Sequence, residues 1–394
     1  MKLNRILSCV VMLSMGMAAH AQYYYQDSKN SEMLRHAERH EPCRKEITLP
    51  KKVNGYNVYK ADLHSHTVFS DGQVLPSFRV QEAWQDGLDI IAITDHLEIR
   101  KYEETMYDYM KAYTDKEYLS RTKGVENGMI DLNFSVRLAQ EEAAKIGMVV
   151  IPGTEISRAG ATVGHFNALF TTDNNTIYDA DAVQSMRNAR AQGALVMHNH
   201  PGWRRTSIGM TEVETAAYEE GLINGVEVMN GKEFYPGIID RVRERGLFIA
   251  SNSDIHFSTA NDYRITGHLR NMTFILAEDS SLESIKEALL ARRAIAFGYN
   301  TLCGEEQILT DFFKASVRVV PVPGQEDVCM LTNLTSIPYV LKRGNGNPFR
   351  LDPFSTIKTS VSKKTGLMEM TLINVWTGVD SHLKVSLPAE WNVD

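Results

Sequence analysis

The sequence predicts an α/β domain built on a parallel sheet or barrel, followed by a smaller antiparallel β domain. From Asn57 to about Asn300, short apolar runs that suit buried strands alternate with charged, helix-like stretches. Several helix-like stretches end in glycine, as the C-caps of helices commonly do. After Tyr299 the pattern changes to apolar and polar residues in alternation, broken by Gly, Pro and Asn clusters. These three observations define the two-part fold.

The expected strands are NVYKADLHSH, LDIIAITDH, MVVIPGTEI, HFNALF, ALVMHNH, NGVEVMN, LFIASNSDIH and MTFILA. The expected helices between them are PSFRVQEAWQDG, DLNFSVRLAQEEAAKIG, DAVQSMRNARAQG and SSLESIKEALLARR. Because the connections are short, this alternation predicts right-handed βαβ units. A Tyr- and acid-rich insertion, Lys101–Met129, follows the TDH motif. It is either a lid or substrate wall or a surface helical hairpin.

The N-terminus has the pattern of a cleaved signal peptide. Lys2 and Arg5 precede the apolar run Ile6–Met17, which is short for a membrane span, and Ala19–Ala21 fits a small-x-small cleavage site. We therefore expect an exported protein, periplasmic or secreted, that is cleaved near Ala21/Gln22. No later segment is apolar enough to be predicted as a transmembrane helix.

Composition narrows the class of protein. The chain has 394 residues, a hydrophobic fraction of 43% and a charged fraction of 23%, as in ordinary globular proteins. The net charge is −7, and losing the two basic residues of the leader makes it −7 − 2 = −9. An acidic protein gains nothing from bulk electrostatics near polyanions, so no nucleic acid partner is expected. Without CxxC spacing a cysteine zinc site is not expected, and Cys303 and Cys329 either form a disulfide or stay free thiols.

Polar side chains gather at the ends of the expected strands. In DLHSH, residues Asp62, His64 and His66 alternate, so in a strand they share a face, and Asp71 in the following turn can return to the same place. Seven of the eleven histidines outside the leader lie at such strand ends. The further polar residues at these positions are Asp95, His96, Glu155, His165, His198, His200, Asp254 and His256.

This pattern predicts a metal site. The carboxyl ends of parallel strands assemble active sites in barrels and open α/β sheets. Imidazoles and carboxylates collected there need a cation, and Zn, Mn and Fe bind both ligand types. About nine ligands exceed what one ion needs, so we expect two or three divalent ions with Glu155 as a bridge. The alternative is a hydrogen-bonded polar cluster without metal, and for Asp62 and His198 a role in supporting ligands is the alternative to binding an ion.

The motifs DLHSHTVFSDG, ITDH, GTEIS, GH, NHPG and SDIH, in this order, resemble those of the PHP (polymerase and histidinol phosphatase) family. The resemblance covers roughly Asn57–Tyr299. It implies a distorted (β/α)7 barrel, usually with three metal ions at its C-terminal face, and phosphoesterase activity. Together with the patterns described above, the predicted domains are a signal peptide at 1–21, an N-terminal extension at 22–56, the PHP-like metal-dependent barrel at 57–300 and, outside the resemblance, a β-sandwich-like domain at 301–394. The implied metal ligands are His64, His66, Asp71, His96, Glu155, His165, His200, Asp254 and His256.

The expected function is therefore hydrolysis of a phosphomonoester or small phosphodiester by a metal-bridging hydroxide. His198 or Asp95 is the expected acid for the leaving group. The cations expected to bind a small phosphorylated substrate are Arg158, Arg204, Arg205, Lys232 and Arg264. Two alternatives stay open: a metal-dependent hydrolase of another bond such as an amide, and a metal- or glycan-binding surface protein. Substrate identity and oligomeric state are not predicted.

Overall fold

The computed structural model describes residues 24–36, 43–113, 131–158 and 163–392. The chain divides into two compact units, Met1–Cys43 and Arg44–Asp394. In the first unit, β1 (Tyr24–Gln26) and β2 (Leu34–His36) form an antiparallel hairpin. The predicted signal peptide lies outside the described residues. Of the predicted insertion, Glu103–Tyr113 forms helix α3, and 114–129 also lies outside the described residues.

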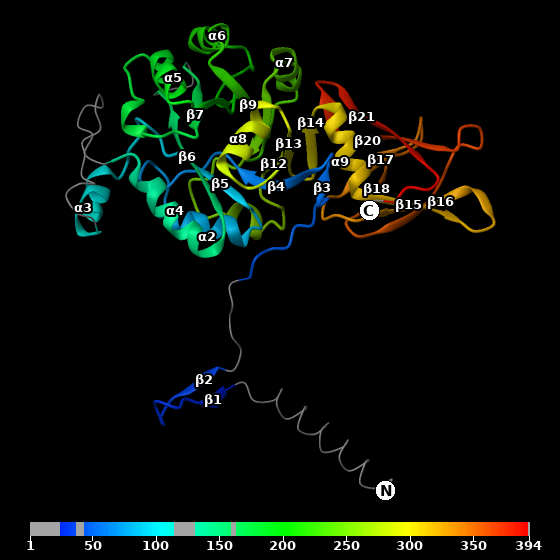
Figure 1. The fold of residues 1–394 in the computed structure, drawn as a ribbon, viewed down its shortest axis with the longest axis horizontal. Helices are drawn as coiled ribbons and strands as arrows, with labels where there is room; N and C mark the ends of the chain where they lie inside the picture. The colour runs from blue at the N-terminus through cyan, green and yellow to red at the C-terminus, as the bar shows by residue number, and fades with distance from the viewer. Residues whose placement is uncertain (1–23, 37–42, 114–130, 159–162, 393–394) are drawn as a thin grey trace. The chain divides into compact units, whose positions relative to one another are not determined.

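The second unit contains a large mixed sheet in which all eight expected strands are present (Figure 1). Its strands up to residue 304 are β3 (Lys52–Val53), β4 (Tyr56–Asp62), β5 (Ile90–Ile93), β6 (Val149–Ile156), β7 (His165–Leu169), β8 (Leu195–Asn199), β9 (Ile223–Asn230), β10 (Glu233–Phe234), β11 (Phe248–Asn252), β12 (Met272–Ala277), β13 (Ala294–Gly298) and β14 (Thr301–Gly304). Strand β5 is the short buried run IIAI, in which every side chain is packed.

Helices cover this sheet. They are α2 (Pro76–Gln85), α4 (Phe134–Ile146), α5 (Ala182–Ala191), α6 (Glu212–Glu219), α7 (Gly237–Arg245) and α8 (Leu282–Leu290). The four predicted helices correspond to α2, α4, α5 and α8. Gly147 ends α4 in the left-handed conformation (φ 70°), as expected for a glycine C-cap. Helix α6 begins with a capping box in which Thr211 and Glu214 bond each other's backbone N–H. Among the described residues, no helix is both long and apolar enough to cross a membrane.

The direction of the strands corrects the prediction of a parallel sheet. Pairs β4–β5, β5–β6, β8–β9 and β9–β11 are parallel, whereas β7 is antiparallel to both β6 and β8. The reason is the short connection of residues 157–164 between β6 and β7, which has no room for a crossover helix. Strand β12 is likewise antiparallel to β4.

The sheet curls until β11 approaches β12 and β13. Ser251 of β11 donates from its hydroxyl to the Phe297 carbonyl of β13 over 2.8 Å, and its N–H donates to Thr273 Oγ1 of β12. An isolated bridge joins Ser65, beyond β4, to Ile255, beyond β11. Within the described part of the chain, no strand ladder joins β11 to β12 or to β4. A closed barrel therefore stays a prediction.

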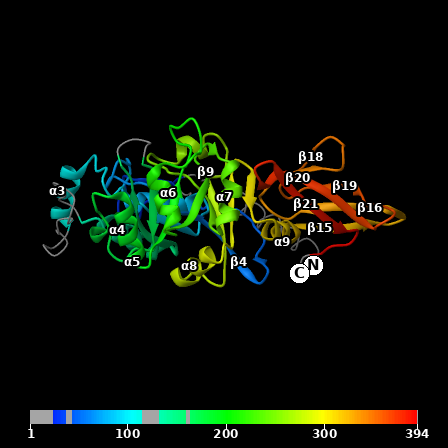
Figure 2. The same ribbon diagram turned by 90° about the horizontal axis from the view of Figure 1, so that it is seen from above.

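The C-terminal region adds antiparallel strands, as predicted, and lies on the side of β14 away from α4 and α5 (Figures 1 and 2). Strands β15 (Val317–Val322), β16 (Gln325–Asn333) and β19 (Thr356–Ser360) form a separate sheet. Strands β17 (Tyr339–Lys342), β18 (Phe349–Leu351), β20 (Leu367–Gly378) and β21 (Ser381–Pro388) extend the large sheet through β14.

One part of the C-terminal region was predicted wrongly. The region after Tyr299 was expected to consist of antiparallel strands, but its residues 311–316 (DFFKAS) belong to helix α9 (Glu306–Ser316), which buries Phe312 and Phe313. In a helix these two residues share one apolar face with Leu309, whereas the alternation beyond Val317 does form a strand. Cys303 and Cys329 are both buried free thiols, so the disulfide considered between them is not formed.

Candidate metal centre

The nine predicted ligands come together at the ends of six strands. Most of them follow β4, β5, β8 or β11, while Glu155 lies near the end of β6 and His165 is the first residue of β7. They meet because the carboxyl ends of parallel neighbours lie at one edge of a sheet. Three sets of residues could each hold an ion, because within each set the ligand atoms lie within 4.8 Å of one another. The sets are His66, Asp71, His96 and His256; His64, Glu155 and His200; and His64, His66 and Asp254. We name the first set the outer group and the second the inner group.

Glu155 lies at the middle of the cluster and is buried. Its Oε2 lies 2.9 Å from His96 Nδ1, 3.4 Å from His66 Nε2 and 3.5 Å from His64 Nε2. Its Oε1 lies 3.3 Å from His165 Nδ1 and 3.6 Å from His200 Nε2. The two oxygens of one carboxylate therefore face two different sets of imidazoles. This is the arrangement expected of a carboxylate that bridges ions.

The outer group is the more open part of the cluster. The Asp71 side chain is 26% exposed and that of His256 is 27% exposed. Asp71 Oδ1 lies 3.2 Å from His256 Nε2, 3.5 Å from His96 Nε2 and 3.9 Å from His66 Nδ1. This oxygen is buried and accepts no hydrogen bond among the described residues. A buried carboxylate oxygen without a donor, surrounded by three imidazole nitrogens, fits a divalent cation.

His64, His66 and Asp254 meet from two different strands. Asp254 Oδ1 lies 3.1 Å from His66 Nε2 and 3.2 Å from His64 Nε2, while the two imidazole nitrogens are 3.1 Å apart. Asp254 has φ 52°, and the ligand His200 has φ 23°, so both depart from ordinary extended backbone directly after a strand. Such conformations in non-glycine residues are uncommon and recur where the fold fixes a functional side chain.

The electrostatics of the cluster favour cations. Burial by itself lowers the pKa of His64, but the carboxylates of Asp254, Glu227 and Glu155 outweigh it and raise that pKa well above its usual value. Burial also lowers the pKa of His256, but the carboxylates of Asp71 and Asp254 outweigh burial and raise that pKa to about 9. The pKa values of His96 and His200 are also raised, mainly by Glu155 against the effect of burial. The carboxylates thus attract positive charge to this place.

Not every imidazole gains a proton. Burial is the main cause that lowers the pKa of His66 to about 3, and charge repulsion from the neighbouring His256 and His96 acts in the same direction. The ring is therefore neutral and offers a nitrogen lone pair, which is the form that binds a metal ion. The pKa of Asp71 is held at about 2 because its histidine neighbours outweigh burial. The residues present fit divalent ions in both ligand type and charge.

Sequence reasoning missed the side chains that hold the ligands in place. Glu227 of β9 lies with its Oε1 2.9 Å from His64 Nδ1, and its Oε2 accepts from the His200 backbone N–H. Asn199 donates from Nδ2 to Glu155 Oε1 over 2.9 Å. Hydrogen bonds of this kind fix the orientation of metal ligands. The available signal was an acid within the otherwise apolar run of β9, because carboxylates are almost never fully buried without a partner.

Asp62 shares the alternation of DLHSH but is not part of the cluster. Its Oδ2 lies 2.9 Å from Arg270 Nε and 2.7 Å from Arg270 Nη2, and Ser253 Oγ donates to it as well. Arg270 and Asp62 are both fully buried. Asp62 lies behind His64, whose backbone N–H donates to Asp62 Oδ1. This position agrees with a role of Asp62 in supporting ligands.

Neither residue expected as the leaving-group acid faces the cluster. His198 lies with Nδ1 3.0 Å from the Tyr218 hydroxyl and Nε2 3.0 Å from Glu214 Oε1, so both ring nitrogens are engaged by α6. Asp95 accepts from the Thr67 N–H over 2.7 Å and from the Ser70 hydroxyl over 2.8 Å. Their catalytic assignment stays a prediction, and the structure lends it no support, because both side chains already complete hydrogen bonds that hold α6 and the 67–70 turn.

Four of the five predicted substrate-binding cations have acidic partners. Arg158 pairs with Glu98, Arg205 with Glu214 (2.8 Å), Lys232 with Asp262 (3.4 Å) and Arg264 with Asp86 (3.2 Å). The structure therefore does not support these four residues as substrate-binding groups.

Arg204 is different. It is exposed, and its guanidinium lies over the Trp203 ring at 4.4 Å, with no acidic partner among the described residues. The Trp203 ring in turn lies 5.3 Å from the His165 ring and 5.4 Å from the His200 ring. Among the predicted cations, Arg204 is therefore the one held beside the cluster by the Trp203 ring, with N–H groups that are available to an anion.

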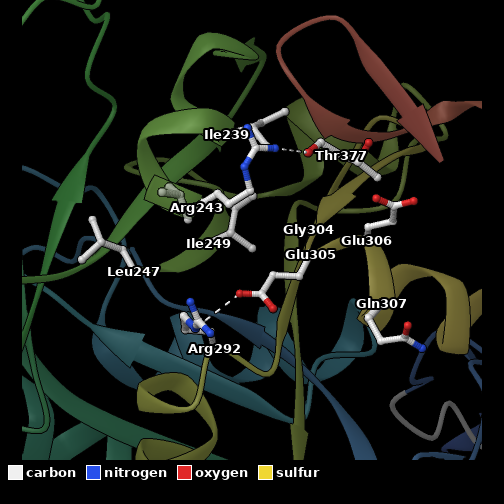
Figure 3. Close-up of a pocket in the computed structure, with 11 residues that line it drawn as sticks. Ile239, Arg243, Leu247, Ile249, Arg292, Gly304, Glu305, Glu306, Gln307 and Thr377 are labelled. Carbon is white, nitrogen blue, oxygen red and sulfur yellow. Dashed lines mark hydrogen bonds and ion pairs between the residues drawn. The ribbon is translucent and has the colours of Figure 1, made fainter. Parts of the chain in front are cut away.

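The cavity in Figure 3 lies elsewhere in the fold. It has a volume of about 320 Å³ and an apolar wall from α7 and β11, with Arg243, Arg292 and Glu305 around it. Arg292 pairs with Glu305, and Arg243 donates to the Thr377 carbonyl of β20 (Figure 3). Among the described residues that line it, none belongs to the histidine cluster. It lies at the junction between α7 and β11 on one side and the C-terminal strand β20 on the other.

A mixed α/β sheet that gathers six histidines and three carboxylates at its strand ends defines a class of metal-dependent enzyme. Residues 62–296 match the PHP domain family, and the chain belongs to that family of metal-dependent phosphoesterases. No curated protein matches the chain.

Among solved structures, a two-domain protein from Bacteroides vulgatus, described as containing a predicted PHP-like metal-dependent phosphoesterase, is 33% identical. The match covers 89% of this chain and 99% of that chain, with a TM-score of 0.76. Histidinol phosphate phosphatase from Lactococcus lactis, complexed with zinc, L-histidinol and phosphate, is 17% identical (51% and 87% covered, TM-score 0.24). A lesion-specific endonuclease from Pyrococcus furiosus is 16% identical (63% and 59% covered, TM-score 0.39).

Proposed function

We propose that this protein is an exported phosphoesterase that hydrolyses a phosphomonoester or small phosphodiester with two or three divalent ions. The ions would be held by the nine ligands His64, His66, Asp71, His96, Glu155, His165, His200, Asp254 and His256. Zn, Mn and Fe all suit these ligand types. Membership of the PHP family supports the reaction class.

The observation that carries the proposal is the place of Glu155. One of its oxygens faces His64, His66 and His96, and the other faces His165 and His200. A single carboxylate between two sets of imidazoles is suited to joining two ions. Bound divalent ions supply Lewis acidity to phosphate oxygens and lower the pKa of coordinated water to near 7.

The chain's own residues orient and charge the site. Glu227 holds the His64 ring, and Asn199 holds one Glu155 oxygen, so neither ligand has to be ordered when a substrate arrives. Asp71 and His256 form the side that is open to solvent, which gives a substrate its way in.

Arg204 is the proposed partner of the phosphate oxygens. Trp203 holds the Arg204 guanidinium in place, and no described acid neutralises it. The charge of Arg204 is therefore free to form strong hydrogen bonds with a bound anion. Replacing it with alanine should raise KM for a phosphorylated substrate more than it lowers kcat. Arg264→Ala is the matched control, since that guanidinium is engaged by Asp86 and Gln85.

Metal content tests the proposal first. Purified protein should contain two or three equivalents of Zn, Mn or Fe by elemental analysis, and it should hydrolyse members of a panel of phosphomonoesters and small phosphodiesters. His64→Ala and Glu155→Ala should lose both metal and activity. His268→Ala is the control, because that histidine is exposed and packs on Tyr299 away from the cluster. Full metal content and activity in both cluster variants would contradict the proposal.

The same panel separates the alternatives. Activity on amides but not on phosphate esters would favour a metal-dependent hydrolase of another bond. A protein that binds metal or glycan and hydrolyses nothing would favour a surface-binding function. Export has its own test: an N-terminus at Gln22 in the mature protein, read by mass spectrometry, supports cleavage, and an intact leader contradicts it.

A further inference from the structure

Two side chains of α2 reach two of the three loops that carry the outer group, those of His66 and His256. Arg79 and Glu82 lie three residues apart on this helix, and both are buried. Arg79 Nη1 lies 2.8 Å from Glu82 Oε2, so the buried guanidinium has its counter-ion beside it. Neither residue is one of the nine ligands, and the proposed reaction gives neither of them a task.

Arg79 joins two segments that are far apart in sequence. Its Nε and Nη2 both donate to the His66 carbonyl, over 3.1 and 2.9 Å, while Nη1 donates to the Phe257 carbonyl over 2.8 Å. One rigid planar group thus spans the backbone at His66 and the residue after His256. The rings of these two histidines stack at 4.2 Å between centroids.

Glu82 holds the second of these segments from the other side. Its Oε1 accepts from the Ser258 hydroxyl and from the Thr259 N–H, each over 2.8 Å. The segment that follows His256 is therefore bonded to α2 at three consecutive residues, Phe257, Ser258 and Thr259. Charge-assisted bonds of this kind are stronger than those between neutral groups.

The other buried arginine near the cluster has a different task. Arg270 bonds Asp62 and Ser253, which lie behind His64 and Asp254. Arg79 and Arg270 therefore support different parts of the cluster. Of these two arginines, Arg79 is the one that bonds the backbone of the loops that bear His66 and His256. Isolated backbone bonds such as that from the His66 N–H to the Ile255 carbonyl join these loops, in place of the continuous ladder that orders residues within a strand.

Resting on the proposed function, we infer that Arg79 and Glu82 are positioning residues that set the geometry of the outer group and thereby the affinity of its ion. The outer group depends on this clamp because Asp71 and His256 are partly exposed and lie in loops. Loosening the clamp changes the separation of His66 and His256 without removing any ligand. Loss of residues that orient ligands typically lowers metal affinity by about 10–100-fold.

The test is a Mn²⁺ titration of chelator-treated full-length protein, with free Mn²⁺ read by electron paramagnetic resonance. Glu82→Gln should bind one equivalent about 10–100-fold more weakly than the wild-type protein, with the remaining equivalents unchanged. Excess Mn²⁺ should restore the lost equivalent and the activity together. Ser258→Ala removes one of the bonds to Glu82 and should act in the same direction but less strongly.

Arg190→Lys is the matched control. Arg190 is a half-buried arginine of α5 that donates to the Ala194 carbonyl over 2.9 Å and touches none of the ligand loops. Its Mn²⁺ binding should equal that of the wild-type protein.

The outcomes separate the two proposals. A wild-type protein that binds no Mn²⁺, Zn²⁺ or Fe²⁺ contradicts the proposed function itself. A wild-type protein that binds Mn²⁺, with Glu82→Gln and Ser258→Ala both keeping wild-type affinity at every equivalent, overturns the clamp alone. Equal weakening of all equivalents also overturns it, since a general loss of structure has no reason to select one ion.

Discussion

Replacing Arg270 with methionine leaves the buried Asp62 carboxylate without its counter-ion. Both side chains are fully buried, and the shortest distance between their charged atoms is 2.7 Å. At an effective dielectric constant of about 20, two unit charges at this distance attract by about 6 kcal/mol. Desolvation offsets part of this attraction, and breaking a buried pair from one side typically costs about 3–5 kcal/mol. We therefore expect Arg270→Met to lower the free energy of unfolding by about 3–5 kcal/mol.

The assay is urea unfolding of chelator-treated protein, followed by circular dichroism, so that bound metal does not contribute to stability. Asp62→Asn combined with Arg270→Met removes both charges and should recover a large part of the loss, because no uncompensated buried charge remains. A loss below about 1 kcal/mol in the single variant would refute the reasoning. A double variant whose losses simply add would refute it too, because contacting partners in one ion pair are expected to be coupled.

Three further predictions concern other parts of the fold. Histidine and arginine neighbours outweigh burial and hold the pKa of Glu214 at about 2, below the usual 4.5, so its stabilising effect is present above pH 4.5 and is lost as pH falls towards 2. Glu214→Gln should therefore be less stable than the wild-type protein by about 3 kcal/mol at pH 6, with the difference vanishing near pH 2 in urea unfolding. Asn199→Ala frees one Glu155 oxygen and should weaken metal binding by about 10–100-fold in competition with a chelator. At Gly225 of β9 a Cβ would lie 2.2 Å from the Phe248 ring, so Gly225→Ala should lower the stability measured in urea by about 1–3 kcal/mol.

Each of these has a contrary result. A stability difference for Glu214→Gln that does not change between pH 6 and pH 2 would show that its charge is not the cause. Unchanged chelator competition in Asn199→Ala would remove its role in orienting Glu155. A fully stable Gly225→Ala would show that Phe248 moves aside without cost.

The strands and their polar ends were predictable because both are local properties. Apolar runs of four to six residues predicted β4 to β9, β11 and β12, and the histidines and acids at the ends of these runs were identified from their position. The alternation rule placed His64 and His66 together, and the structure brings their ring nitrogens to 3.1 Å.

The same rule failed where the strand stopped. Strand β4 ends at Asp62, and His64 and His66 reach the cluster from beyond the strand, whereas the Asp62 carboxylate faces Arg270, 208 positions further along the chain. The rule would also place His198 and His200 on one face, but β8 ends at Asn199 and His200 takes φ 23°, which separates the two rings. A change of backbone direction at a strand end depends on what packs around it, and no local pattern reports that.

The sequence alone determined the residue types, their order and their position at strand ends. These identified the family and predicted a metal site, because ligand chemistry belongs to the side chain. The tertiary structure decided which polar residues are available to bind an ion and which are already engaged by neighbours. Asp62, Asp95 and His198 are satisfied by Arg270, Thr67 and Glu214, whereas Asp71 has a buried oxygen that makes no hydrogen bond within the described residues and is surrounded by imidazole nitrogens. A buried carboxylate is a ligand candidate only when no neighbour completes its hydrogen bonds, and those neighbours are assembled by the fold.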